Sequence, residues 1–246
     1  MKLSVCIDAV TGSMKPGESI RKVAALGVPA FEFWAWWGKD LDEINDAIAD
    51  TGLVPAALCT KFVSLTEPSL RDEYIVGLKE TIEAAKKIGC TRIISQVGAD
   101  TGASRESQHT SLVRGLAASA PILEAAGMTL VIEPLNTKIN HKGYYLYSGK
   151  ESFEIIDEVD SPAVKLLYDI YHQQIMDGDI IRSTTENIDK IAHFHAAGNP
   201  GRNELDNGEL NYHAIFKAID KAGYTGYAGL EYWPLEPWED GIKRFL

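Results

Sequence analysis

Four short segments in the second half of the chain each end an apolar run with an acidic or imidazole side chain. IEPLN contains Glu133, YDIYH contains Asp169, HFHAAGNPGR contains His195 and GLEYWP contains Glu231. Burying three carboxylates together is costly unless a cation neutralises them. The set therefore predicts one divalent metal ion, with Mn²⁺ or Mg²⁺ favoured by the oxygen-rich donors and Co²⁺ or Zn²⁺ as alternatives.

Two of these carboxylates also have the chemistry that a proton transfer requires. A carbon next to a carbonyl is a weak acid, and a metal held by the carbonyl and a neighbouring hydroxyl oxygen stabilises the ene-diolate that forms when its proton leaves. Glu133 and Glu231 would carry the proton from opposite sides of the substrate. Return of the proton to the neighbouring carbon gives isomerisation, return to the same carbon gives epimerisation, and the sequence leaves both open.

These residues can meet only if the apolar runs before them are neighbouring parallel strands. Eight such runs occur, and most are almost continuously apolar, as expected of strands buried on both faces. The predicted strands are Leu3–Ile7, Ala30–Trp34, Leu53–Leu58, Arg92–Val97, Thr129–Glu133, Val164–Asp169, Ala192–Ala196 and Tyr227–Tyr232. In the seventh, His193 and His195 alternate and should point to the same face, toward the inside.

Amphipathic segments between the strands predict helices, and five of them end at a glycine, which supplies the left-handed residue that terminates a helix. The predicted helices are Ser19–Leu26, Leu41–Thr51, Ser69–Ile88, Glu106–Ala126, Lys150–Val159, Ile180–Asn187, Tyr212–Ala222 and Pro237–Leu246. This alternation over 246 residues without a linker predicts an α/β fold, a (β/α)8 TIM barrel forming one domain over residues 1–246. The active site of such a barrel lies at the C-terminal ends of its strands.

Composition limits the partners of the protein. Its net charge is −11, which argues against a nucleic acid because phosphate binding needs clustered Lys and Arg. The sequence contains no run long and apolar enough for a membrane span, and its first residues lack signal-peptide architecture. Three widely spaced cysteines, Cys6, Cys59 and Cys90, predict buried free thiols in a reducing cytoplasm.

The motifs EPLN, YDIYH, HFHAAGNPGR, NGELNY and GLEY occur in an order and spacing that resemble the hydroxypyruvate isomerase family, within the xylose isomerase-like TIM barrel sugar isomerases and epimerases. The resemblance implies that Glu133, Asp169, His195 and Glu231 bind the metal and that Glu133 and Glu231 carry protons. It also implies that His172 and Arg202 contact oxygens of a sugar or keto acid substrate.

This chain departs from the family pattern at two positions. Hydroxypyruvate isomerases tend to carry Gln at the position of His195, and the epimerases carry a further glutamate where this chain has Ile139. The resemblance therefore supports the fold, the metal and the reaction type better than any particular substrate.

Other residues are candidates for the site on their positions alone. Lys61 follows the third strand and either binds an anionic substrate or lies on the surface. Trp34 belongs to the FWAWW segment and either walls the pocket or packs in the core. Glu209 in NGELNY is expected to organise its loop by bonding backbone amides or Arg202.

Three other functions stay open. The same metal and base would serve a lyase that removes water from a keto-sugar or cleaves a 3-keto-glycoside. A DNA-repair endonuclease of this fold would need more histidines and a basic surface, against the six histidines and negative charge here. A non-catalytic sugar-binding subunit would not need all four metal candidates, and tryptophans near the barrel mouth are compatible with a homo-oligomer.

Overall fold

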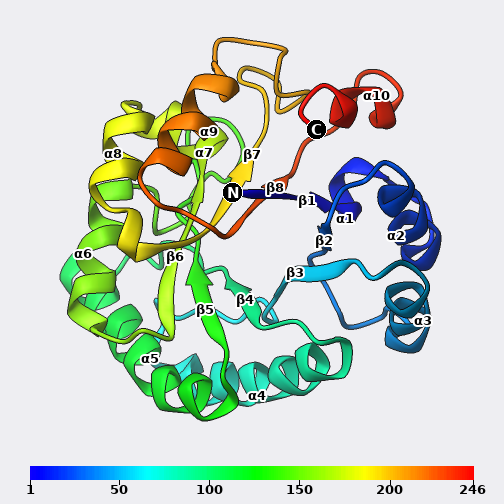
Figure 1. The fold of residues 1–246 in the computed structure, drawn as a ribbon. Helices are drawn as coiled ribbons and strands as arrows, with labels where there is room; N and C mark the ends of the chain where they lie inside the picture. Colours follow the sequence, from blue (N-terminus) through cyan, green and yellow to red (C-terminus); the bar gives the residue numbers. More distant parts are fainter.

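The computed structural model describes all 246 residues, and its eight parallel strands close into a barrel (Figure 1). The strands follow one another in chain order, and β8 pairs with β1 to close the ring. They span β1 Lys2–Cys6, β2 Ala30–Glu32, β3 Val54–Cys59, β4 Arg92–Ser95, β5 Thr129–Ile132, β6 Val164–Asp169, β7 Ile191–Ala196 and β8 Tyr227–Leu230. The predicted (β/α)8 barrel is confirmed.

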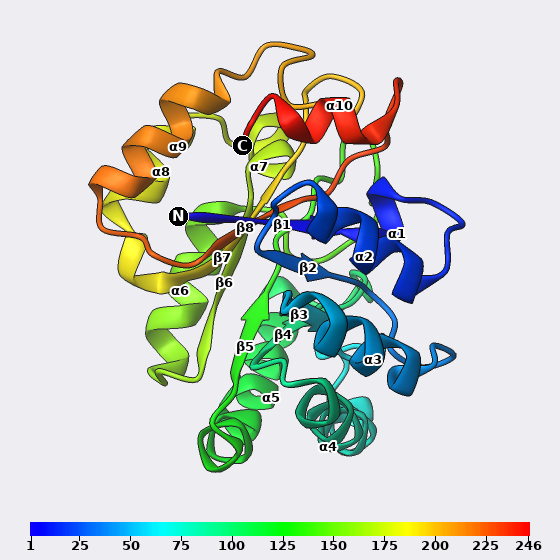
Figure 2. The same ribbon diagram turned by 45° about the vertical axis from the view of Figure 1, so that its right-hand side comes forward.

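Helices surround the barrel on its outside, as the two views show (Figures 1 and 2). They span α1 Ile7–Val10, α2 Pro16–Ala25, α3 Leu41–Thr51, α4 Arg71–Ile88, α5 Arg105–Ala126, α6 Gly149–Val159, α7 Ile170–Met176, α8 Ile180–Glu186, α9 Tyr212–Lys221 and α10 Trp238–Lys243, with short 3₁₀ turns at Pro68–Leu70 and Ile188–Lys190. None of these helices combines the length and apolarity that crossing a bilayer requires.

Most predicted helices agree with the structure, and the differences have local causes. Helix α2 begins at Pro16 rather than Ser19, because proline suits the first helical position, where no backbone N–H is needed. The glycines predicted to end helices do so, as at Gly52 and Gly89, where φ is 71° and 73°. The short helices α1 and α7 were not predicted, because each follows its strand without an intervening loop.

Apolar side chains pack in two places. A large cluster of 55 buried residues fills the space between the strands and the surrounding helices. A second cluster of five, Ala57, Cys59, Ile94, Val131 and Leu167, comes from four adjacent strands, β3 to β6. Cys59 and Ile94 from this cluster also line the cavity described below. All three cysteines are buried and free, as predicted.

Candidate functional site

A cavity of about 290 Å³ opens among residues that follow or end the strands, where the active site of this fold lies. One part of its wall is polar and includes Glu133, His172, His195, Arg202 and Glu231. The other part is apolar and consists of Trp34, Cys59, Phe62, Ile94, Leu135 and Trp233. The cavity therefore offers a charged region beside an apolar wall.

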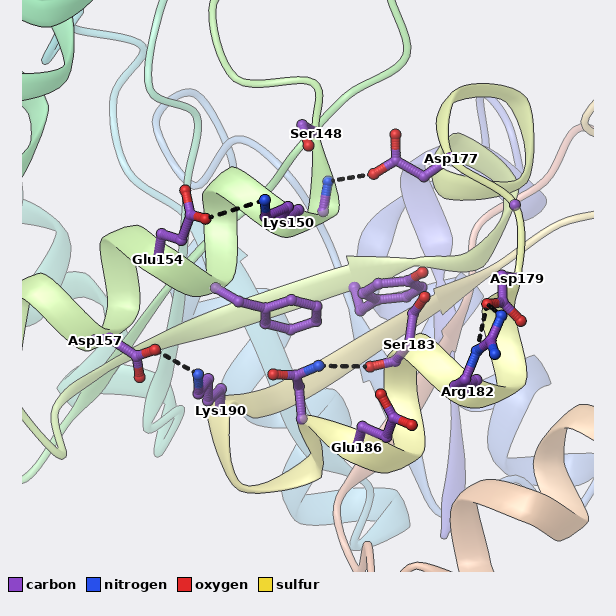
Figure 3. Close-up of a pocket in the computed structure, with 15 residues that line it drawn as sticks. Ser148, Lys150, Glu154, Asp157, Asp177, Asp179, Arg182, Ser183, Glu186 and Lys190 are labelled. Atoms are coloured by element: carbon purple, nitrogen blue, oxygen red, sulfur yellow. Dashed lines mark hydrogen bonds and ion pairs between the residues drawn. The ribbon is translucent and has the colours of Figure 1, made fainter.

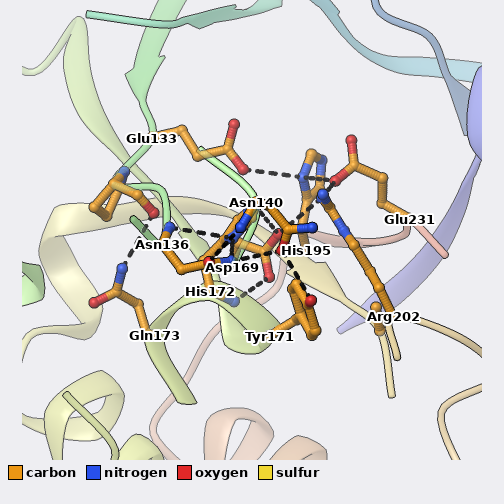
Figure 4. Close-up of polar contacts among 12 residues, drawn as sticks. Glu133, Asn136, Asn140, Asp169, Tyr171, His172, Gln173, His195, Arg202 and Glu231 are labelled. Carbon is orange, nitrogen blue, oxygen red and sulfur yellow. Dashed lines mark hydrogen bonds and ion pairs between the residues drawn. The ribbon is translucent and has the colours of Figure 1, made fainter. Parts of the chain in front are cut away.

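Glu133, Asp169, His195 and Glu231 meet at this cavity, and Figure 4 shows their side chains turned toward one another. Asp169 is the last residue of β6 and His195 lies in β7, whereas Glu133 and Glu231 each stand one residue beyond their strand. One donor atom from each residue lies within 4.8 Å of the other three, and all four side chains are buried. Four consecutive strands thus bring together the residues that the sequence singled out.

Two of the atoms that could bind a metal have no hydrogen-bond partner in the protein. Glu133 Oε1 and His195 Nδ1 are buried and make no hydrogen bond. His195 Nδ1 lies 3.6 Å from Glu133 Oε1 and 3.4 Å from Glu231 Oε2. Buried polar atoms in proteins almost always have a hydrogen-bond partner. Two unpartnered atoms that face each other therefore indicate a site for a ligand such as a metal ion.

The two glutamates differ in their surroundings. Burial raises the pKa of Glu133 to about 7, although His195 opposes the rise. Burial would also raise the pKa of Glu231, but His195 and Arg202 outweigh it and hold that pKa well below its usual range. Glu231 receives hydrogen bonds from the Trp34 indole at 2.6 Å and from Arg202. Glu231 is therefore held as a carboxylate.

This donor set fits a divalent cation. Three carboxylates and one imidazole form a hard, oxygen-rich site, and a cation would pair with both Glu133 Oε1 and His195 Nδ1. Burial disfavours a charged His195, yet Glu231 and Glu32 hold its pKa well above the ordinary value. In the protein alone a proton on His195 thus supplies part of the positive charge that a metal ion would bring.

Glu32, the last residue of β2, contacts two histidines of β7 and was not among the predicted site residues. Its Oε1 lies 2.7 Å from His195 Nε2, and its Oε2 lies 2.9 Å from His193 Nε2. Both histidines therefore point inward, as expected from their alternation in β7. The sequence held a signal for Glu32: it is the one charged residue in the apolar run VPAFEFW, where a buried carboxylate needs a partner.

His172 lies in the first turn of α7, three residues after Asp169, and its ring orientation is set by its neighbours. The backbone N–H of Asn136 donates to His172 Nδ1 at 3.3 Å, and the Asn136 side-chain amide lies 2.6 Å from the same atom. Because Nδ1 accepts, the proton sits on Nε2, which is buried without a hydrogen bond. Burial lowers the pKa of His172 to about 4, so the ring is neutral at neutral pH.

Arg202 reaches the cavity from the loop after β7. Its guanidinium pairs with Glu231 and lies 3.4 Å from Asp169, and it stacks against the rings of Tyr171 and Trp233. The nearby Glu209 accepts a 2.5 Å hydrogen bond from Asn199 and donates its backbone N–H to the Asn199 carbonyl. Glu209 thus ties the loop together through Asn199 rather than through Arg202.

The remaining two predicted residues lie in different environments. Trp34 lines the cavity and bonds Glu231. Lys61 does not line the cavity: its ammonium pairs with Glu80 of α4 and lies over the ring of Trp36. The structure therefore brings Trp34 to the site and turns Lys61 toward the outside of the barrel.

A larger hollow of about 650 Å³ lies outside the barrel, beside α6 and α8 (Figure 3). The three cations that line it are each paired with an acidic neighbour: Lys150 with Glu154, Arg182 with Asp179, and Lys190 with Asp157. No buried polar atom in its lining lacks a partner. The candidate metal ligands that have unpaired buried atoms, Glu133 and His195, lie at the barrel mouth instead.

Comparison with protein families places this barrel. The family model described as "Xylose isomerase-like TIM barrel" matches residues 20–246. The chain belongs to the xylose isomerase-like TIM barrel family. The match covers all four candidate metal ligands and both histidines of β7, and it confirms the resemblance seen in the sequence motifs.

Proteins similar to this chain include several named as isomerases. The hydroxypyruvate isomerase of Escherichia coli (strain K12) is 32% identical over 232 residues, which cover 90% of this chain and 89% of that protein. The 2-oxo-tetronate isomerase of Cupriavidus necator is 37% identical over 168 residues, covering 68% of this chain and 64% of that protein. The relatives thus include enzymes named for two different substrates.

A solved structure of the xylose isomerase-like fold carries a different name. A protein from Brucella melitensis described as an AP endonuclease, family 2, superposes with a TM-score of 0.94 at 25% identity, covering 100% of this chain and 98% of that one. Such similarity extends over the whole barrel.

Proposed function

We propose that this protein is a divalent-metal-dependent isomerase or epimerase of a small hydroxy-carbonyl compound, a sugar or a keto acid. The observation that carries the proposal is the meeting of Glu133, Asp169, His195 and Glu231, with Glu133 Oε1 and His195 Nδ1 left unpartnered in a buried cavity. The names of the isomerase relatives support the same reaction class.

These four residues would hold the metal ion, with Mn²⁺ or Mg²⁺ favoured by the carboxylate donors. When bound, a divalent cation polarises a substrate carbonyl and makes the neighbouring C–H more acidic. His195 contributes its Nδ1, while its Nε2 is already engaged by Glu32.

Glu133 and Glu231 would move the proton. With Oε1 given to the metal ion, Glu133 keeps its second oxygen for a proton from the substrate carbon, and this side chain lines the cavity. Glu231 is held in place by Trp34 and Arg202, which fix the direction of its carboxylate. If one glutamate moved the proton to the adjacent carbon, the substrate would be isomerised. If the other glutamate returned a proton to the same carbon from the opposite side, the substrate would be epimerised.

His172 would bind a substrate oxygen. Asn136 occupies its Nδ1, so Nε2–H is the ring group left to donate; it makes no hydrogen bond and lies 3.4 Å from Asp169 Oδ2. The His172 side chain lines the cavity. A neutral imidazole donor stabilises negative charge on an oxygen without itself losing a proton. Arg202 lies beside it and would orient the same end of the substrate.

The cavity size favours a small substrate. Its volume of about 290 Å³ lies at the lower end of the roughly 300–1,000 Å³ that small-molecule pockets span. This size suits a compound of three to six carbons better than a glycoside with a second ring, which weighs against the glycoside-cleaving lyase. Loss of water from a keto-sugar would need an acid at the leaving group, and Lys61, one of two candidates, is turned away toward Glu80.

An endonuclease activity is disfavoured by charge. A polynucleotide needs unpaired cations to meet its phosphates. The chain carries a net charge of −11, and the one arginine lining the cavity is already paired with Glu231 and Asp169.

A metal-reconstituted screen in heavy water tests the proposal. Purified protein loaded with Mn²⁺ or Mg²⁺ is incubated with keto acids, ketoses and aldoses of three to six carbons, and deuterium in the recovered compound is followed by NMR and mass spectrometry. Exchange at a carbon next to the carbonyl, with or without an isomeric product of unchanged mass, is expected. Loss of 18 mass units would identify dehydration instead, and no exchange in any compound would refute the proposal.

A further inference from the structure

Glu32 accepts from three side chains inside the barrel. His195 Nε2 lies 2.7 Å from Oε1, while His193 Nε2 at 2.9 Å and the Ser4 hydroxyl at 2.5 Å both meet Oε2. These partners come from β7 and β1, and Glu32 is only 1% exposed. The carboxylate is therefore clamped between two strands directly behind the candidate metal ligand.

The fold also keeps space for this carboxylate. Gly229 of β8 faces it, and a Cβ at that position would lie 2.2 Å from Glu32 Oε1 and 2.6 Å from its carboxyl carbon. Real Cβ contacts of that length do not occur, so any larger residue at 229 would displace the carboxylate. Strand β8 thus lacks a side chain at the one place where Glu32 needs room.

We infer that Glu32 is a positioning residue for the metal centre: it holds the Nε2–H of His195, so that Nδ1 is the ring nitrogen left to bind the metal beside Glu133, Asp169 and Glu231. The inference rests on the proposed function, because it assigns Glu32 a role in the same metal site. Glu32 itself does not line the cavity and touches no substrate.

The physical reason is that a neutral imidazole can present either nitrogen as a lone pair. A carboxylate that accepts from one ring nitrogen selects the tautomer and fixes the ring plane, and loss of such a partner typically weakens metal affinity about 10- to 100-fold. Here the distances leave no alternative acceptor for His195 Nε2, since Glu32 Oε1 is its hydrogen-bond partner in the barrel. His193, bound to the other oxygen, helps to hold that carboxylate in place.

Two variants test this role in the full-length protein, with the Mn²⁺ dissociation constant as the readout. Glu32→Gln keeps the size of the side chain but replaces the acceptor that faces His193 or His195 by an amide donor. Gly229→Ala keeps every hydrogen-bonding group and pushes the carboxylate away. Each is expected to weaken Mn²⁺ binding by about 10- to 100-fold, as measured by calorimetry or by electron paramagnetic resonance of free Mn²⁺.

Glu204→Gln is the matched control. Glu204 is also a buried glutamate, but it accepts from the backbone N–H groups of Leu235 and Glu236 and does not line the cavity. Its Mn²⁺ affinity should equal that of wild type. Proton NMR of the Zn²⁺-loaded protein gives a signature that altered stability alone would not move: the His195 Nε2–H resonance should lie far downfield in wild type and in Glu204→Gln, and shift upfield in Glu32→Gln.

The outcomes separate the two hypotheses. Wild-type protein that binds no divalent ion refutes the proposed function. If wild-type protein binds Mn²⁺, and Glu32→Gln binds it with equal affinity and shows the same His195 resonance, only the role of Glu32 is refuted. Equal weakening in Glu204→Gln also refutes it, and if Glu32→Gln does not fold, unchanged affinity in Gly229→Ala does the same.

Discussion

The indole Nε1 of Trp34 donates a 2.6 Å hydrogen bond to Glu231 Oε1, joining residues 197 positions apart in the chain. Trp34 follows β2 and Glu231 follows β8, so the closure of the barrel is what brings them together. The bond occupies one carboxylate oxygen, and Arg202 occupies the other.

Trp34→Phe should keep the apolar wall and remove only this donor. A hydrogen bond to a charged group contributes about 1.5–3 kcal/mol, so turnover should fall by about 10- to 100-fold as Glu231 loses its fixed direction. Steady-state kinetics on the substrate found in the screen measures the change. Trp36→Phe is the matched control, because its indole donates to Thr81 away from the cavity; equal losses in the two variants would contradict the assigned role.

Glu133→Gln should abolish most proton transfer and leave the fold intact. The amide cannot accept the substrate proton, and general-base catalysis typically contributes about 100- to 10,000-fold. The rate of deuterium exchange from heavy water should drop by that factor, while the circular dichroism spectrum stays unchanged. Exchange at the wild-type rate in this variant would contradict the role of Glu133 as the base, whereas no exchange in either protein would favour a non-catalytic, sugar-binding protein.

Arg202→Met should destabilise the metal-free protein strongly. The substitution leaves Glu231 and Asp169 buried without their cationic partner, and breaking a buried ion pair from one side typically costs about 3–5 kcal/mol. Urea unfolding measures this free energy. Saturating Mn²⁺ should recover part of the loss because a cation at the same carboxylates replaces the missing charge, and an equal loss with and without Mn²⁺ would speak against a shared site.

Gly198→Ala should disturb the loop that carries Arg202. A Cβ at residue 198 would lie 2.3 Å from the Glu204 carbonyl oxygen and 2.5 Å from that of Asn207, so the loop must open. We expect a loss of about 1–3 kcal/mol in unfolding free energy, together with lower turnover. Gly77→Ala is the control: its Cβ would meet Lys61 at an ordinary 3.6 Å, and an alanine inside α4 should leave turnover unchanged and stability equal or higher.

Much of this architecture could be predicted from the sequence because its signals are local. Apolar runs, helix periodicity and glycine terminators follow from a few neighbouring residues, and barrel closure then places Glu133, Asp169, His195 and Glu231 at one end. The direction of His193 and His195 followed from strand alternation in the same way.

What could not be predicted depends on contacts between distant strands. Whether Lys61 turns into the cavity or out of it is decided by Glu80 on the following helix. The role of Glu32 depends on its hydrogen bonds to His193 and His195, which lie more than 160 positions away in the sequence. The short helices α1 and α7 lack the length over which a helical period can be recognised.

Counting bound metal tests the central claim most directly. Protein is dialysed against Mn²⁺, freed of excess ion and analysed for metal per chain, as wild type and as Asp169→Asn, with Asp177→Asn as a control that alters an aspartate outside the barrel mouth. One Mn²⁺ per chain is expected in wild type and in the control, and far less in Asp169→Asn. Wild-type protein without bound ion, or full occupancy in Asp169→Asn, would contradict the proposed metal site.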